Sequence, residues 1–161
     1  MQLDPQTRPS GDGVPTMSNL IREFKGEYRF LSNFWYVDVE YKGVKYPSTE
    51  HAYQAQKCIS PLDKALVLKC DTPAQAKALG RDVPAVPDWD NIKLDIMKDL
   101  LLIKFNQPDL KRMLLATGDA VLQEGNYWGD AYWGVKLTDG SGENHLGKLL
   151  MEVREHYKHE P

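Results

Sequence analysis

Residues 47–57 carry side chains that could do acid–base or nucleophilic chemistry. A helical register places four of them on one face: Glu50, Tyr53, Gln54 and Lys57. A carboxylate there can protonate a leaving group or activate water. A lysine in a desolvated pocket can attack an aldehyde or a ring-opened sugar. Charged faces of this kind are common on solvated helices, so the spacing alone favours an ordinary surface helix.

A second candidate segment, residues 126–134, combines an acid with aromatic side chains. Four of its nine residues are aromatic, and a glycine follows each of its two tryptophans, Trp128 and Trp133. Aromatic rings stack on nucleobases and on the apolar face of a sugar. A partly dry aromatic setting would raise the pKa of Asp130 and suit it to general acid catalysis. A tight turn between core strands, with Asp130 bonding the turn, explains the segment equally well.

Three further residues have one functional and one structural interpretation each. Asn33 can present its amide to a base edge or a ribose hydroxyl, although a turn position is commoner. Arg81 can clamp a phosphate, although a surface pair with Asp82 is commoner. Trp89 is either a lid over a site or a hydrophobic staple at the start of a helix.

These residue types together suit the cleavage of a bond at the anomeric carbon of a sugar. The transition state of that reaction resembles an oxocarbenium ion, which a nearby carboxylate stabilises. Aromatic rings would hold the leaving base, and an amide would orient the ribose.

The composition is that of one globular domain with a tail. The chain has 161 residues, of which 42% are hydrophobic and 27% charged, which excludes a wholly disordered protein. Prolines and glycines interrupt residues 1–19, which we expect to be a disordered tail before a domain of residues 20–161. The net charge of −3 argues against a protein held to nucleic acid mainly by a broad basic face.

Membrane and metal partners are not expected. No apolar run reaches the roughly 20 residues that a membrane span needs, and the N-terminus lacks a signal-peptide pattern. We therefore expect a soluble, cytoplasmic protein. Cys58 and Cys70 are expected to be reduced thiols, and neither His51 nor His145 has neighbours spaced like metal ligands.

The order of the predicted elements points to an α+β fold that is mainly helical with short β-strands. The aromatic stretch from residue 28 reads as β-like, with a hairpin over 37–46 that turns at Lys42 and Gly43. Helices are predicted over 49–58, from 61, from 73 to a stop at Gly80, over 88–105, over 108–117 and from about 144. Residues 120–139 predict short strands and loops. The core-facing stripe of the fourth helix is expected to be Ile92, Ile96, Leu100 and Ile103.

Eight short motifs occur in an order and spacing that identify a family. They are residues 26–34, 46–57, 78–81, 89, 104–105, 114–117, 127–130 and 144–154. Together they resemble the NADAR (NAD- and ADP-ribose-associated) family over residues 22–157. The resemblance implies an α+β domain without a metal or other cofactor, so that residues 20–161 form an NADAR-like N-glycosidase domain.

The resemblance also implies substrates. Members of the family hydrolyse reactive riboflavin-pathway intermediates that carry ribose 5-phosphate, or remove ADP-ribose from modified guanine. The expected partner is therefore a small nucleotide or an ADP-ribosylated guanine, free or within DNA or RNA. The oligomeric state stays open.

The resemblance carries site residues over by position. Glu50, Lys57 and Asp130 match the family's catalytic positions. Six residues would line the pocket for ribose, phosphate and base: Asn33, Phe34, Arg81, Trp89, Trp128 and Trp133.

Two mechanisms and one non-catalytic alternative remain from the sequence. Either Asp130 or Glu50 protonates the departing base while the other supports the cationic sugar, or Lys57 traps a ring-opened ribose as a Schiff base. The alternative is a module that binds ADP-ribose or NAD and senses it. The presence of two acids and a lysine argues against that alternative, because a pure binder has no need of them.

Overall fold

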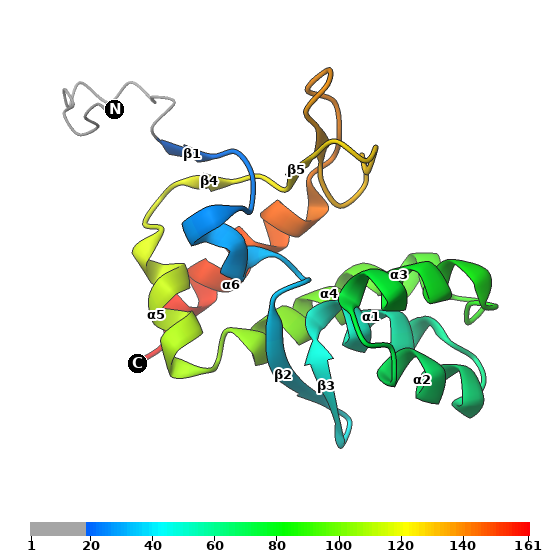
Figure 1. The fold of residues 1–161 in the computed structure, drawn as a ribbon. Helices are drawn as coiled ribbons and strands as arrows, with labels where there is room; N and C mark the ends of the chain where they lie inside the picture. Colours follow the sequence, from blue (N-terminus) through cyan, green and yellow to red (C-terminus); the bar gives the residue numbers. More distant parts are fainter. Residues whose placement is uncertain (1–18) are drawn as a thin grey trace, which may run out of the picture.

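Six α-helices, six short β-strands and one 3-10 helix make up the part of the chain that the computed structural model describes, residues 19–161 (Figure 1). The first half contains β1 (Leu20–Ile21), η2 (Gly26–Leu31), β2 (Tyr36–Tyr41), β3 (Val44–Ser48), α1 (Thr49–Lys57), α2 (Pro61–Leu68) and α3 (Pro73–Asp82). The second half contains α4 (Trp89–Lys104), α5 (Pro108–Ala116), β4 (Val121–Leu122), β5 (Gly125–Asn126), β6 (Val135–Lys136) and α6 (His145–Lys158). The predicted α+β class is confirmed. The predicted tail, apart from its last residue, lies outside the described residues.

The strands form three two-stranded sheets rather than one large sheet. Strands β2 and β3 pair antiparallel, whereas β1 pairs with β4 and β5 with β6 in parallel. The β2–β3 hairpin turns as predicted at Lys42 and Gly43, whose φ angles of 51° and 82° are those of the turn that matches strand twist. The β1–β4 pair joins segments that are distant in sequence, whereas the β5–β6 pair closes the loop between Asn126 and Val135.

Three of the predicted helices begin, at the predicted positions, with a side-chain cap. Ser48 accepts a hydrogen bond from the backbone N–H of His51, and Ser60 caps α2 in the same way. Thr72 and Gln75 form a reciprocal capping box at the start of α3. The cap at Ser48 sets the rotation of α1 and so fixes the direction in which Glu50 projects.

Two element boundaries differ from the prediction. Helix α3 does not stop at Gly80 but continues to Asp82, because Gly80 fits against α1 where a side chain would not. The aromatic stretch that reads as β-like begins instead with η2, Gly26–Leu31, whose Phe30 and Leu31 are buried. Aromatic side chains can pack into a core from a 3-10 helix as well as from a strand. Their abundance alone therefore led to the wrong secondary structure for residues 26–31.

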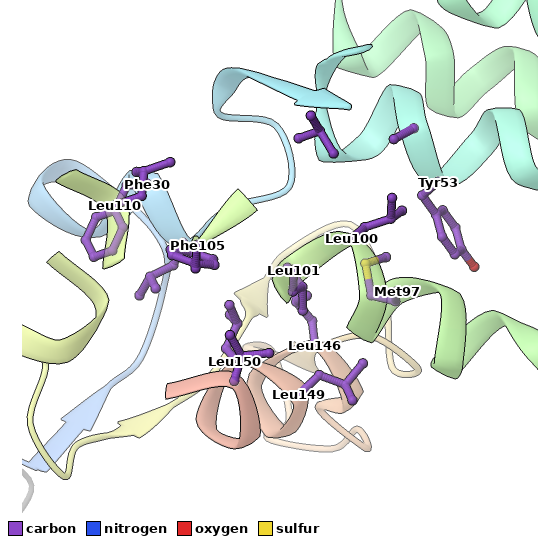
Figure 2. Close-up of a cluster of buried hydrophobic side chains, with 14 of the residues drawn as sticks. Phe30, Tyr53, Met97, Leu100, Leu101, Phe105, Leu110, Leu146, Leu149 and Leu150 are labelled. Atoms are coloured by element: carbon purple, nitrogen blue, oxygen red, sulfur yellow. The ribbon is translucent and has the colours of Figure 1, made fainter. Parts of the chain in front are cut away.

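Helix α4 contacts both α1, from the first half of the chain, and α6, from its C-terminal end (Figure 1). Its buried face differs from the predicted stripe, of which only Leu100 is fully buried. In the buried cluster shown in Figure 2, Leu101 lies toward Leu146 of α6, whereas Leu100 lies on the side of Tyr53 of α1. The remaining predicted residues of the stripe, all isoleucines, are half-buried at its margin. Because α4 is covered from two sides, a single stripe could not describe its contacts.

Helix α4 ends on a fully buried lysine, Lys104. Its ammonium group donates to the backbone carbonyl of Ser32 at 2.9 Å, and burial lowers its pKa to about 7. This contact anchors the segment that leads into Asn33 and Phe34.

The wild-type protein is expected to gain stability relative to Lys104→Met as the pH rises from 7.5 to 9. Over this range the folded state holds Lys104 largely neutral while the unfolded chain, with the ordinary pKa of 10.5, remains protonated. The contribution is full above 10.5 and is lost as the pH falls through 7. The difference in unfolding free energy should grow by about 2 kcal/mol in urea titrations. Lys98→Met, at a half-exposed lysine of the same helix, is the control. Parallel pH profiles for wild type and Lys104→Met would contradict the prediction.

None of the helices within residues 19–161 is long and apolar enough to cross a membrane. Cys58 and Cys70 are both free thiols, as expected.

Candidate active site

A cavity of about 770 Å³ lies where the two halves of the domain meet. Its walls come from the segment between β1 and β2, from α1 and α3, from the start of α4 and from the loop that follows β5. Cavities of this size accommodate nucleotide-sized ligands. All of the predicted site residues except Arg81 line it: Asn33, Phe34, Glu50, Lys57, Trp89, Trp128, Asp130 and Trp133.

Glu50 is a buried carboxyl group in the first turn of α1. Its Oε2 accepts a hydrogen bond from Gln54 Nε2 at 2.7 Å, and its backbone N–H donates to the carbonyl of Asn33 at 3.1 Å. Burial raises the pKa of Glu50, and the charge of Asp130 raises it further. The Gln54 hydrogen bond and the charge of Lys77 oppose that rise. Glu50 therefore binds a proton more readily than an exposed glutamate does, although Gln54 and Lys77 both favour its carboxylate form.

Asp130 is fixed by the loop that carries it. Its Oδ1 accepts hydrogen bonds from the backbone N–H groups of Tyr132 at 3.0 Å and Trp133 at 2.9 Å. The Asn126 side chain binds both backbone polar groups of Asp130, each at 3.0 Å. Asp130 thus bonds the turn, as one interpretation predicted, and it also lines the cavity, where the functional interpretation requires it to be. A carboxylate held this rigidly is oriented before any ligand arrives.

A third carboxyl group of the cavity, Glu124, was missed by the sequence analysis. Burial and the charge of Asp130 raise the pKa of Glu124 to about 7, against the opposing effects of Asn126 and Lys77. Asn126 Nδ2 donates to Glu124 Oε2 at 3.3 Å. The available signal was a lone acid directly before the short strand β5, a position where carboxylates are uncommon. Glu50, Glu124 and Asp130 thus form one coupled group.

Lys57 and Lys77 both line the cavity but make different contacts. Lys57 donates from Nζ to the carbonyl of Gly80 at 2.7 Å, which holds its amine at the end of α1. Lys77, which the sequence analysis also missed, places Nζ 5.9 Å from the ring centre of Phe34 and 5.6 Å from that of Trp128. Arg81 lies one turn beyond Lys77 on α3, exposed and outside the cavity.

Aromatic rings form one wall and the mouth of the cavity. The ring centre of Tyr53 lies 5.1 Å from that of Trp89 and 5.5 Å from that of Trp133, so three rings from α1, α4 and the β5–β6 loop pack together. Trp128 is instead 64% exposed at the mouth. The wall can exclude water from the carboxyl groups, while Trp128 offers a free face for stacking.

Two buried amide oxygens lack partners within the described residues. They are Asn33 Oδ1 and Gln54 Oε1, and both residues line the cavity. Buried acceptors of this kind are normally satisfied, so a ligand donor is a reasonable complement for them. In residues 19–161 no group of three or more His, Cys, Asp or Glu side chains is placed to hold a metal ion.

Gly80→Ala is expected to lower kcat about 10- to 100-fold while the protein stays folded. A Cβ on Gly80 would overlap the side-chain amide of Gln54, which must then move away from Glu50. Alanine is itself favoured over glycine in a helix, so the unfolding free energy should change by less than about 1 kcal/mol. Steady-state kinetics and urea unfolding measure the two effects. Ala78→Gly, at an exposed position of α3, should show the reverse pattern of reduced stability with retained activity. An active Gly80→Ala enzyme would show that the Gln54 contact is dispensable.

Carboxyl groups gathered in a cavity with aromatic walls are typical of enzymes that hydrolyse glycosidic bonds. The chain belongs to the NADAR family, whose domain matches residues 21–158. It is 37% identical over 132 residues to the N-glycosidase YbiA of Escherichia coli, covering 80% of this chain and 81% of that protein. It is 40% identical over 134 residues to the N-glycosidase Npun_R5314 of Nostoc punctiforme, covering 80% and 85%.

A longer relative and a solved structure extend the comparison. The riboflavin biosynthesis protein VVA0006 of Vibrio vulnificus is 40% identical over 129 residues, which are 78% of this chain but only 35% of that protein. The NMR structure of E. coli YbiA superimposes with a TM-score of 0.78 at 35% identity, covering 89% of this chain and 88% of that one. The relatives named N-glycosidases support the predicted enzyme class, a hydrolase acting on N-glycosyl compounds.

Proposed function

We propose that this protein hydrolyses the bond between ribose C1 and a base nitrogen in a phosphorylated ribosyl compound. The observation that supports it most strongly is the gathering of Glu50, Glu124 and Asp130 in one cavity with aromatic walls. Carboxyl groups whose surroundings separate their proton affinities can divide acid and charge-stabilising roles between them.

In the proposed mechanism Glu124 is the proton donor. Its pKa of about 7 lets it hold a proton at neutral pH and release it to the departing base nitrogen. As the C1–N bond breaks, positive charge develops on the ribose, and the carboxylates of Glu50 and Asp130 stabilise it. Water then adds to C1 and gives a proton to the carboxylate of Glu124, which restores the acid and leaves a free base and a ribosyl product.

The aromatic residues and amides would hold the two halves of the substrate. Trp128 and Phe34 offer faces for stacking on a base, and the unpartnered Asn33 Oδ1 can accept from a ribose hydroxyl or a base amino group. Two substrate classes fit this arrangement. One is ADP-ribosylated guanine, free or in a nucleic acid, and the other is a ribosylaminopyrimidine phosphate of riboflavin synthesis. A relative named as a riboflavin biosynthesis protein supports the second, while the volume of the cavity also admits the larger ADP-ribosyl group.

A base-release assay by mass spectrometry tests the proposal and separates the substrates. Wild type, Glu50→Gln and Asp130→Asn would each receive ADP-ribosylated guanosine, as nucleoside and in DNA, and the ribosylaminopyrimidine phosphates. Release of ADP-ribose that both variants lose identifies a de-ADP-ribosylating enzyme. Release of ribose 5-phosphate alone identifies an enzyme of metabolite clearance. Binding of ADP-ribose without release of any base would favour the non-catalytic sensor.

A covalent route through Lys57 is distinguishable from direct hydrolysis. Lys57 lines the cavity, and its amine could replace the base nitrogen on a ring-opened ribose to give an imine, which water would then hydrolyse. Borohydride added during turnover would reduce that imine to a stable adduct on Lys57. Direct hydrolysis leaves no adduct on the lysine.

A further inference from the structure

A single buried amide, that of Asn126, connects two of the three acids of the site. Asn126 is 1% exposed and does not line the cavity, whereas Glu124 and Asp130 both do. Its Nδ2 donates to the backbone carbonyl of Asp130 at 3.0 Å and to Glu124 Oε2 at 3.3 Å, with a longer contact to the Glu124 carbonyl at 3.4 Å. Its Oδ1 accepts from the backbone N–H of Asp130 at 3.0 Å. Within residues 19–161, every side-chain hydrogen bond of Asn126 therefore goes to one of these two acidic residues.

The neighbouring backbone leaves space for this amide at one place only. A Cβ on Gly134 would stand 2.8 Å from Asn126 Nδ2 and 2.1 Å from the carbonyl oxygen of Glu124, so a side chain at position 134 would displace both. The same carbonyl of Glu124 accepts a hydrogen bond from the backbone N–H of Val135 at 2.9 Å. The amide is thus held in a fixed position relative to both acids.

The backbone of Asp130 also fixes which way the amide points. An asparagine side chain can turn over and exchange its oxygen and nitrogen, but the N–H and the carbonyl of Asp130 are each satisfied in one orientation alone. Nδ2, a donor, therefore faces Glu124 Oε2, which must accept. The proton of neutral Glu124 then belongs on Oε1, which has no hydrogen-bond partner among the described residues.

We propose that Asn126 is a positioning residue for the reaction. Its amide keeps the proton of Glu124 on the oxygen that is left for the departing base, and it holds Asp130 beside that acid. Asn126 acts only through these two residues, because it does not reach the cavity itself. The inference rests on the proposed function, which makes Glu124 the proton donor. A residue that merely closes the turn would need the bonds to Asp130 but not the bond to Glu124.

The groups around Glu124 set the sign of the expected effect. Burial raises the pKa of Glu124, and the charges of Asp130 in the same loop and of Glu50 in α1 also raise it. The Asn126 hydrogen bond and the charge of Lys77 in α3 lower it, because both stabilise the carboxylate form. Removal of the amide should therefore raise this pKa.

Carbon-13 NMR of the Glu124 carboxyl group tests the contact without turnover. Its resonance is assigned by its loss in Glu124→Gln, and its titration midpoint should rise by roughly 0.5 to 1 pH unit in Asn126→Ala. Because Asn126→Ala also frees the backbone of Asp130, the comparison is repeated with Asp130→Asn in both proteins. The charge of Asp130 is then absent, and the same rise should remain.

The wild-type protein supplies a second test that does not depend on whether Asn126→Ala folds. The side-chain amide protons of Asn126 should change their chemical shift with pH at the midpoint of Glu124. Glu124→Gln should abolish that change, because glutamine does not titrate. An amide that does not respond to the titration of Glu124 overturns the inference.

Kinetics test whether the contact matters for the reaction. Asn126→Ala should lower kcat about 100-fold, the size of effect that follows from misplaced catalytic groups. The alkaline limb of kcat/KM should move to higher pH together with the NMR midpoint. Partial unfolding would lower the whole pH profile without moving its midpoint.

Asn144→Gly is the matched control. Asn144 Oδ1 accepts from the backbone N–H of Glu124 at 3.0 Å and its Nδ2 donates to the carbonyl of Leu122 at 2.9 Å, so it holds the same segment without touching the carboxyl group. Glycine adopts the φ of 55° at this position without strain. The control should lose stability in urea unfolding but keep the wild-type midpoint. A midpoint that moves equally in Asn144→Gly and Asn126→Ala contradicts a specific role of Asn126.

The outcome for Asn126 is separable from that for the proposed reaction. A raised Glu124 midpoint in Asn126→Ala, in a protein that releases no base, supports the hold of Asn126 on Glu124 and contradicts the proposed function. Base release that Asn126→Ala performs with the kcat and midpoint of wild type supports the function and overturns the inference.

Discussion

Glu50→Gln is expected to reduce kcat about 1,000-fold, the size of effect that follows when a group stabilising transition-state charge is removed. Glutamine has nearly the shape of glutamate and can keep a hydrogen bond to Gln54, so the first turn of α1 should be unchanged. It carries no negative charge with which to stabilise the positive charge that develops on the ribose. Single-turnover rates with saturating substrate would report the loss in the chemical step alone.

The matched control for Glu50→Gln is Asp90→Asn. Asp90 is also an acid of the cavity wall, but its side chain is 89% exposed and already paired with Lys93. Its variant should keep kcat within about threefold, since exposed ion pairs contribute little. A Glu50→Gln enzyme that retains more than a tenth of wild-type kcat would show that Asp130 alone can support the cationic ribose.

The sequence located the helix that carries Glu50 because the signals for its start are local. A serine before the first turn caps α1, and the glycine-containing turn at Lys42 and Gly43 closes the preceding hairpin. Once the start of α1 is fixed, helical geometry places Glu50 and Lys57 about two turns apart on one face. Both residues line the cavity, as the family resemblance implied, whereas the spacing alone had favoured an ordinary surface helix.

The sequence could not predict that Lys77 and Glu124 line the cavity or that Arg81 does not. A helical pattern gives the face on which a residue lies but not how far a cavity extends along the helix axis. Arg81 lies one turn, about 6 Å, beyond Lys77, and that distance separates an exposed side chain from one in the cavity. The backbone of Glu124 is held by hydrogen bonds from Val135 N–H and to Asn144 Oδ1, contacts that have no local signal in the sequence.

Buried polar residues are similarly invisible to hydrophobic periodicity. Lys104 occupies a fully buried position on α4, although a lysine in a helix normally predicts an exposed face. Its single carbonyl partner, Ser32, is distant in sequence and belongs to the segment that leads into the cavity. Close packing is equally hidden in the sequence: a glycine late in a helical pattern indicates a helix end, but Gly80 instead lets α3 pack closely on Gln54.

The pH dependence of kcat/KM is expected to have an alkaline limb near pH 7 that belongs to Glu124. Below its pKa of about 7 Glu124 is protonated and can give its proton to the leaving base. Above that pH the fraction of protonated enzyme, and with it kcat/KM, should fall about tenfold per pH unit. Glu124→Gln should lower the rate about 100- to 1,000-fold and abolish this limb.

Neighbouring charges should move the alkaline limb in opposite directions. Asp130 raises the pKa of Glu124, so Asp130→Asn should shift the limb of its residual activity to lower pH. Lys77 lowers that pKa, so Lys77→Gln should shift the limb to higher pH. A general loss of structure would not produce shifts of opposite sign. If both variants keep the wild-type midpoint, the titrating group is not Glu124, because removal of a charge beside that carboxyl group must change its pKa.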